Sequence, residues 1–147
     1  MPPGRAWLIA GGAASAAASV AHLACIVGGP RWYRAFGAGE RVAREAERGL
    51  PWPALMTIGV ACVLAVWAAY AFSGAGLIRP LPLLRAALVA VTAIYLARGA
   101  VLVFPAMLRR PDLSAGFLFW SSSIVLAIGV VHAVGLVLAW PHLSGVR

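Results

Sequence analysis

Three ionisable side chains, those of His22, Arg98 and His132, lie inside otherwise apolar segments of this sequence. A charge is costly in such surroundings, so each is a candidate functional residue. A histidine can act as a general acid or base, and an arginine can bind an anion or stabilise developing negative charge. The structural alternative is a hydrogen bond from each histidine to a neighbouring helix, and an Arg98 side chain that extends to the end of its segment.

Counting positions along the apolar segments predicts a layer of polar groups at one depth. This layer is predicted to bind a ligand and comprises His22, Tyr95, Arg98, Ser121 and Ser122. His132 lies near the other end of its segment, about 15 Å from His22 along the helix direction at 1.5 Å per residue. Axial haem ligands must meet at one iron, so a bis-histidine haem is not predicted. No third ligand accompanies either histidine, so no metal site is predicted, and the sequence identifies no cofactor.

All acidic residues lie outside the apolar segments, so a buried arginine must find its partner in a loop. Glu40 is the predicted partner of Arg98 or His22, because Gly37 and Gly39 allow the chain to turn back just before it. The charged loop would then form a lid over a polar pocket. In the alternative, the glutamates of this loop pair with its own arginines on a solvated surface.

The elements that must position these residues are four apolar segments, at about 7–28, 53–78, 82–108 and 113–140. Each reaches the length of about 20 residues that a membrane-spanning helix needs. We therefore expect an all-α fold, an integral membrane four-helix bundle that forms one transmembrane domain over residues 1–147. Recurrent small residues predict close helix contacts on two faces, one with Gly11, Ser15, Ser19, His22 and Cys25, the other with Ser121, Ser122, Gly129, His132 and Gly135.

The loop over residues 29–52 holds five arginines and three of the four acids of the chain. Its first part, PRWYRAF, has the aromatic and basic residues of a segment lying in the headgroup layer. Its second part, GERVAREAERG, predicts a short helix with the pairs Glu40–Arg44 and Arg41–Glu45, ended by Gly49. The loop is therefore expected to be amphipathic, partly helical and interfacial.

Composition excludes a soluble domain, because only 11% of the 147 residues are charged and 63% are hydrophobic. The net charge of +8 comes from arginines that flank apolar runs, which suits the surface of a lipid bilayer and not a nucleic acid. Cys25 and Cys62 lie within apolar runs and are expected to stay unpaired. Seven arginines in the first and third loops against four on the opposite side place both loops in the cytoplasm, which predicts a multi-pass inner-membrane protein.

The run HLACIVGGPRWYRAFGAGERVAREAERG, residues 22–49, resembles a set of uncharacterised short bacterial membrane proteins with four spans. In size and hydropathy, the whole chain is similar to the DoxX-like four-helix group. The resemblance implies a small bacterial four-helix membrane protein and assigns no role to any residue.

The leading functional hypothesis is a non-enzymatic or accessory protein that binds a lipophilic or anionic small molecule in the polar layer. One alternative is a membrane enzyme with a lipid-soluble substrate, His22 as acid or base and Arg98 as the stabiliser of negative charge. A second alternative is a transporter or an assembly subunit, as a homo-oligomer or in a larger membrane complex. The absence of a carboxylate within the apolar segments weighs against proton-coupled transport.

Overall fold

The computed structural model describes residues 3–103 and 114–145, and within these ranges the chain is all helical, without strands. The elements, in chain order, are α1 (Arg5–Ala35), α2 (Glu40–Glu47), α3 (Trp52–Gly74), α4 (Leu84–Gly99), the 3-10 turn η1 (Ala100–Val103), α5 (Ala115–Ala139) and the 3-10 turn η3 (His142–Gly145). Four of the helices, α1, α3, α4 with η1, and α5, are long and apolar enough to cross a membrane. The predicted all-α class is thus confirmed. The predicted segments overlap these helices, but α1 continues well past the predicted end at 28. Positions 104–108 and 113 of the predicted segments lie outside the described residues.

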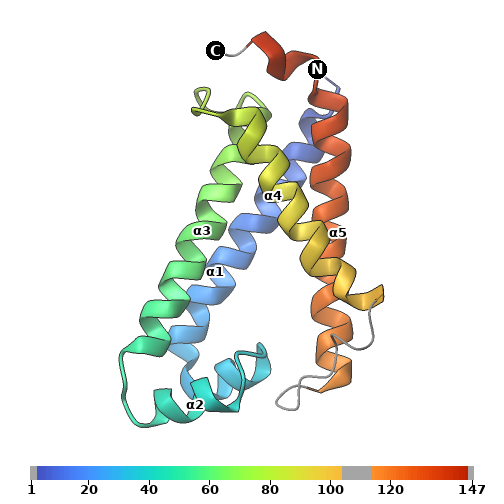
Figure 1. Cartoon of the computed structure of the whole chain (residues 1–147). Coiled ribbons are helices and arrows are strands. Elements are labelled where there is room, and N and C mark those ends of the chain that lie inside the picture. Colours follow the sequence, from blue (N-terminus) through green and yellow to red (C-terminus); the bar gives the residue numbers. More distant parts are fainter. Residues whose placement is uncertain (1–2, 104–113, 146–147) are drawn as a thin grey trace.

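The long helices form two pairs, α1 with α3 and α4 with α5 (Figure 1). The pairs meet at the end that holds the start of α1 and η3, and they diverge towards the end that holds α2. We call these the closed end and the open end. α2 lies across the open end, next to the start of α3.

Small residues allow the two pairs to touch near the closed end. A Cβ atom built on Gly11 of α1 would lie 2.7 Å from Cε1 of His132 in α5, and one on Gly135 would lie 3.0 Å from the Leu8 side chain. Leu8 itself is fully buried in a cluster with Leu84 and Leu88 of α4. The two predicted small-residue faces therefore meet each other inside the bundle, where close backbone approach allows tight packing.

Helix α1 changes direction at Gly29, the first residue of the predicted charged loop. Gly29 has φ 65° and ψ −154°, a conformation that is essentially restricted to glycine. Pro30 follows and has no N–H to continue the helical hydrogen bonds. Residues 30–35, which follow this kink, remain helical, so α1 ends at Ala35 and not at the predicted 28.

The kink brings Tyr33 into the protein interior. Tyr33 is 4% exposed and packs with Cys25 of α1 and with Val42 and Ala43 of α2. The prediction that the PRWYRAF segment lies wholly in the headgroup layer is therefore wrong for Tyr33. Its neighbours Trp32 and Phe36 do remain exposed, and their rings stack with centroids 5.7 Å apart.

Two glycines set the ends of the connection between α1 and α3. Gly37, with φ 72°, follows the end of α1, and its N–H and that of Ala38 donate to the carbonyls of Arg34 and Tyr33. Gly49, with φ 71°, ends α2 in the same way, with its N–H donating to Ala46 O. Both ends are Schellman motifs, which need a left-handed residue at this position. The predicted turn, short helix and glycine stop are all confirmed.

Candidate functional site

A cavity of about 550 Å³ lies between the two helix pairs where they diverge. Its wall on one side is α1 and α3, and its wall on the other side is the first half of α5. At the open end its floor is the end of α1 and the connection to α2, since Ala35, Phe36, Gly37 and Ala38 all line it. Most of the lining is apolar, with Ala18, Ala21, Met56, Val60, Phe117, Trp120, Ile124 and Val125.

Two of the predicted site residues, His22 and Ser121, line this cavity. Each already has one hydrogen bond to its own helix. His22 Nδ1 lies 2.7 Å from Ala18 O, and the Ser121 hydroxyl donates to Leu118 O at 3.3 Å. No hydrogen bond joins His22 to Ser121, so the two do not form the pair of nucleophile and base that a serine hydrolase requires.

Tyr33 and Thr57 bring two further hydroxyl groups to the cavity, and the sequence analysis missed both. Thr57 Oγ1 donates to Pro53 O at 2.7 Å and lies 3.5 Å from the Tyr33 hydroxyl. A threonine within an apolar segment is the signal that could have identified Thr57. Nothing in the sequence identifies Tyr33, because its burial depends on the kink at Gly29.

Tyr95 belongs to the bundle core and does not line the cavity. It is 5% exposed, its hydroxyl lies 2.9 Å from Ser15 Oγ, and its ring meets Trp67 edge to face. Ser15 is about two helical turns from His22 on α1. The prediction of one polar layer is therefore wrong, and Figure 1 shows the reason, since α4 runs obliquely across the bundle. Depth counted along an oblique helix does not equal depth in the bundle.

Arg98 also lies apart from the cavity lining. It is an exposed residue, and its guanidinium donates to Oγ of the fully buried Ser122 at 3.0 Å. This hydrogen bond joins α4 to α5. Arg98 and Ser122 were predicted to bind a ligand, and in the structure they bind each other.

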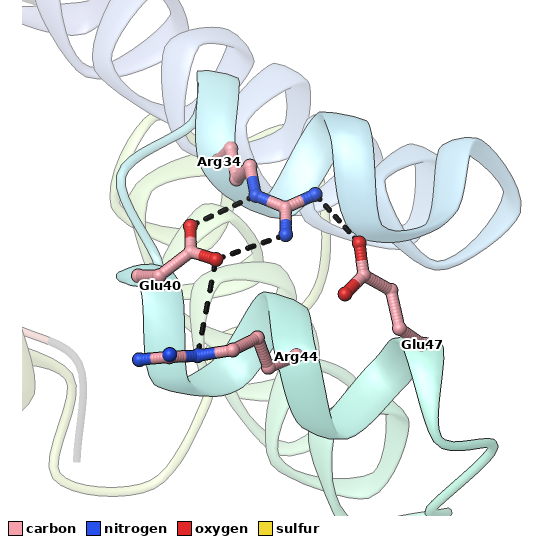
Figure 2. Close-up of polar contacts among 4 residues, drawn as sticks. All are labelled: Arg34, Glu40, Arg44 and Glu47. Carbon is pink, nitrogen blue, oxygen red and sulfur yellow. Dashed lines mark hydrogen bonds and ion pairs between the residues drawn. The ribbon is translucent and has the colours of Figure 1, made fainter.

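Glu40 does not approach Arg98 or His22. Figure 2 shows it bound to Arg34, with Oε2 2.8 Å from Nε and Oε1 3.0 Å from the guanidinium Nη2. Arg44 Nε lies 3.9 Å away on the other side, and Glu47 Oε1 accepts from Arg34 at 2.8 Å. The predicted pairing of Glu40 with Arg98 or His22 is wrong, because Arg34 is six residues away at the end of α1 while Arg98 is on another helix. The rival prediction of pairing within the loop is confirmed, and the pairs Glu40–Arg44 and Arg41–Glu45 both form.

The Arg34 guanidinium is the main reason that the pKa of Glu40 falls below its ordinary value, with a smaller contribution from the charge of Arg44. Arg34 contacts the first residue of α2 through Glu40 and the last through Glu47. One side chain therefore fastens both ends of α2 to the end of α1. We call the three residues Arg34, Glu40 and Glu47 the α2 clamp.

His132 lies in the closed part of the bundle, away from His22. It is fully buried against Gly11 and the Tyr95 ring, and its Nδ1 lies 2.9 Å from Ile128 O. Gly11 precedes His22 by eleven residues on α1, or about 16 Å at 1.5 Å per residue. The two imidazoles therefore cannot meet at one metal ion. Among the described residues, no group of three histidine, cysteine or acidic side chains gathers in one place, and both cysteines are free.

Comparison with models of protein families, with curated proteins and with solved structures found no match for this chain. The predicted likeness to the DoxX-like group is therefore not confirmed, and what the structure supports is four long apolar helices.

Proposed function

We propose that this chain is a multi-pass membrane protein that binds a lipophilic small molecule in the cavity between its helix pairs. The membrane location is supported by four helices of sufficient length and hydropathy and by exposed apolar side chains along them, such as Leu55, Val66 and Val137. Arginines 31, 34, 41, 44 and 48 gather at the open end, which favours the cytoplasmic side for α2. Arg109 and Arg110, which entered the same count, lie outside the described residues.

The observation that carries the binding proposal is the cavity itself. Its volume falls within the range of about 300–1,000 Å³ typical of small-molecule sites, which are mostly apolar with a few polar groups. Here the polar groups are His22, Tyr33, Thr57 and Ser121. Because Arg98 is not among the lining residues, the cavity supports a lipophilic ligand and gives no support to the anionic one that was also predicted.

The two alternatives have less support. The enzymatic hypothesis needs His22 and Arg98 at one site, and only His22 lines the cavity. The assembly hypothesis needs free small-residue faces, and the faces around Gly11 and Gly135 are occupied within the chain. Neither alternative has an observation of its own in its favour.

Filling the cavity tests the proposal. Ala21 lines it, so Ala21→Phe should occupy the space that a ligand would take. The chain would be purified in mild detergent and its bound lipophilic molecules counted by mass spectrometry. The expected result is a loss of at least tenfold in the co-purified molecule.

The matched control is Ala17→Phe, an exposed position one turn earlier on the same helix and not among the lining residues. It should leave the amount of bound molecule unchanged. Equal amounts in both variants and the parent chain would contradict a ligand in this cavity.

A further inference from the structure

The chemistry of the cavity lining restricts the ligand further, and this step depends on the proposed binding function. The lining contains no arginine, lysine, aspartate or glutamate side chain. A charged ligand placed there would lose its hydration without gaining an opposite charge, which costs several kcal/mol or more. The cavity therefore favours a neutral molecule.

His22 offers a specific hydrogen-bonding atom to such a molecule. Its Nδ1 lies 2.7 Å from the Ala18 carbonyl oxygen, which can only accept a hydrogen bond. The proton of the neutral ring must then be on Nδ1, and Nε2 is left with a lone pair that can only accept. No described residue donates to Nε2, although the His22 side chain is half-buried and faces the cavity.

An unpaired acceptor atom such as Nε2 in an apolar cavity favours a ligand that carries a hydrogen-bond donor. An ether, an ester or a hydrocarbon has no proton to give to Nε2, whereas an alcohol or a phenol has one. The other polar groups nearby, the hydroxyls of Ser121 and Tyr33, can exchange hydrogen bonds with the same ligand oxygen. The apolar walls formed by Met56, Val60 and Ile124 suit the rest of a lipophilic molecule.

We infer that the cavity takes a neutral lipophilic alcohol whose hydroxyl group donates a hydrogen bond to Nε2 of His22. The imidazole thus acts as a specificity-determining group and not as a catalyst. The fixed tautomer of its neutral ring, set by Ala18 O, makes Nε2 the acceptor.

The test compares two probes that differ only in the donor, hexadecanol with a terminal pyrene label and the methyl ether of the same molecule. Binding to the full chain in nanodiscs at pH 8 is followed by pyrene fluorescence. A net hydrogen bond of about 1 kcal/mol corresponds to roughly a fivefold preference for the alcohol. His22→Leu should reduce the preference to about one, while His22→Gln, whose side-chain oxygen can replace Nε2 as acceptor, should keep most of it.

His142→Leu is the matched control, because His142 is an exposed histidine at the closed end. It should leave the preference unchanged. The inference would be overturned if the parent chain bound the alcohol and the ether saturably with equal affinity and Ala21→Phe bound neither. The proposed function would then still stand. Tighter binding of the matching pyrene-labelled fatty acid would also overturn the inference. Failure of both probes to bind saturably would overturn the proposed function and the inference with it.

Discussion

At the scale of single residues, the nearest suitable partner decides what a polar side chain does. Glu40 has Arg34 six residues away and binds it with two hydrogen bonds. Arg98 is left with Ser122, a neutral acceptor on the facing helix. Arg98 therefore contributes to the α4–α5 contact, and of these two residues only His22 lines the cavity.

The role of Arg98 predicts a stability effect without a binding effect. Ser122→Ala removes the acceptor of the Arg98 guanidinium, and a hydrogen bond to a charged group is worth about 1.5–3 kcal/mol. We expect a lower midpoint of thermal unfolding in detergent, with pyrene-alcohol binding unchanged below that midpoint. In a chain that already carries Arg98→Leu, Ser122→Ala should lower the unfolding midpoint less, because the Arg98 guanidinium is already absent.

Ser123→Ala is the control for this prediction, since Ser123 bonds only the Phe119 carbonyl of its own helix. It should change the midpoint little. Equal destabilisation by the two serine substitutions would contradict a specific contact between Arg98 and Ser122.

At the scale of elements, the kink in α1 sets the direction of the last residues of that helix at the open end. It turns Tyr33 inwards and carries the end of the helix towards Phe117 of α5, where Gly37 approaches the Phe117 ring too closely for any side chain on that glycine. The position of the cavity floor, residues 35–38, therefore depends on the change of helix direction that Gly29 permits.

Replacing that glycine tests this dependence. Gly29→Ala puts a Cβ on a backbone conformation that costs about 1–3 kcal/mol for other residues. We expect a lower unfolding midpoint and weaker binding of the pyrene alcohol, because the floor moves with the end of α1. The measurements are circular dichroism on heating and the fluorescence titration.

Gly59→Ala in α3 is the matched change, because its Cβ would meet nothing within 4 Å and its backbone is helical. It should be neutral or stabilising by up to about 1 kcal/mol. A Gly29→Ala chain as stable as the Gly59→Ala chain would show that the kink is not needed.

The elements themselves could be predicted from the sequence, whereas the cavity could not. Runs of about 20 apolar residues define the four long helices, and the charge spacing and glycines 37 and 49 define α2 and its ends. The cavity depends on how far the helix pairs diverge and on the oblique course of α4, and neither leaves a pattern in the residue types. His22 and Ser121 were found because they are polar; Ala18, Ala21 and Val125 look like any other apolar residue.

At the scale of the whole molecule, we expect the α2 clamp to hold the floor of the cavity in place, because it fastens α2 to the end of α1. Protonation of Glu40 would release its part of the clamp. Arg34 lowers the pKa of Glu40 in the folded chain below its ordinary value of 4.5. The ion pair between them therefore stabilises the fold fully above pH 4.5, and this stabilisation is lost as the pH falls through the lower folded pKa. The floor should therefore loosen in acid.

Cys25 provides a measurement of this loosening, because it is 4% exposed and lines the cavity, whereas Cys62 is exposed. We expect the labelling rate of Cys25 by dithiodipyridine, divided by that of Cys62, to rise several-fold as the pH is lowered from 7 to well below 4.5, the ordinary pKa of Glu40. Arg34→Gln should raise the ratio already at pH 7 and flatten its dependence on pH. The ratio cancels the effect of pH on the reagent itself.

Arg48→Gln is the control, since the described structure shows no ion pair between Arg48 and the glutamates of α2. A labelling ratio that stays constant with pH in the parent chain and in Arg34→Gln would exclude a role of the clamp in closing the cavity.

The packing at the closed end has a consequence for molecular traffic. Leu8, Leu88 and His132 are fully buried there, glycines bring the backbones of α1 and α5 together, and none of these residues lines the cavity. In a bilayer, a guest could then enter and leave only through the leaflet that surrounds α2. If the proposed function holds, such a chamber would exchange molecules with one monolayer alone, and would hold a molecule without carrying it across.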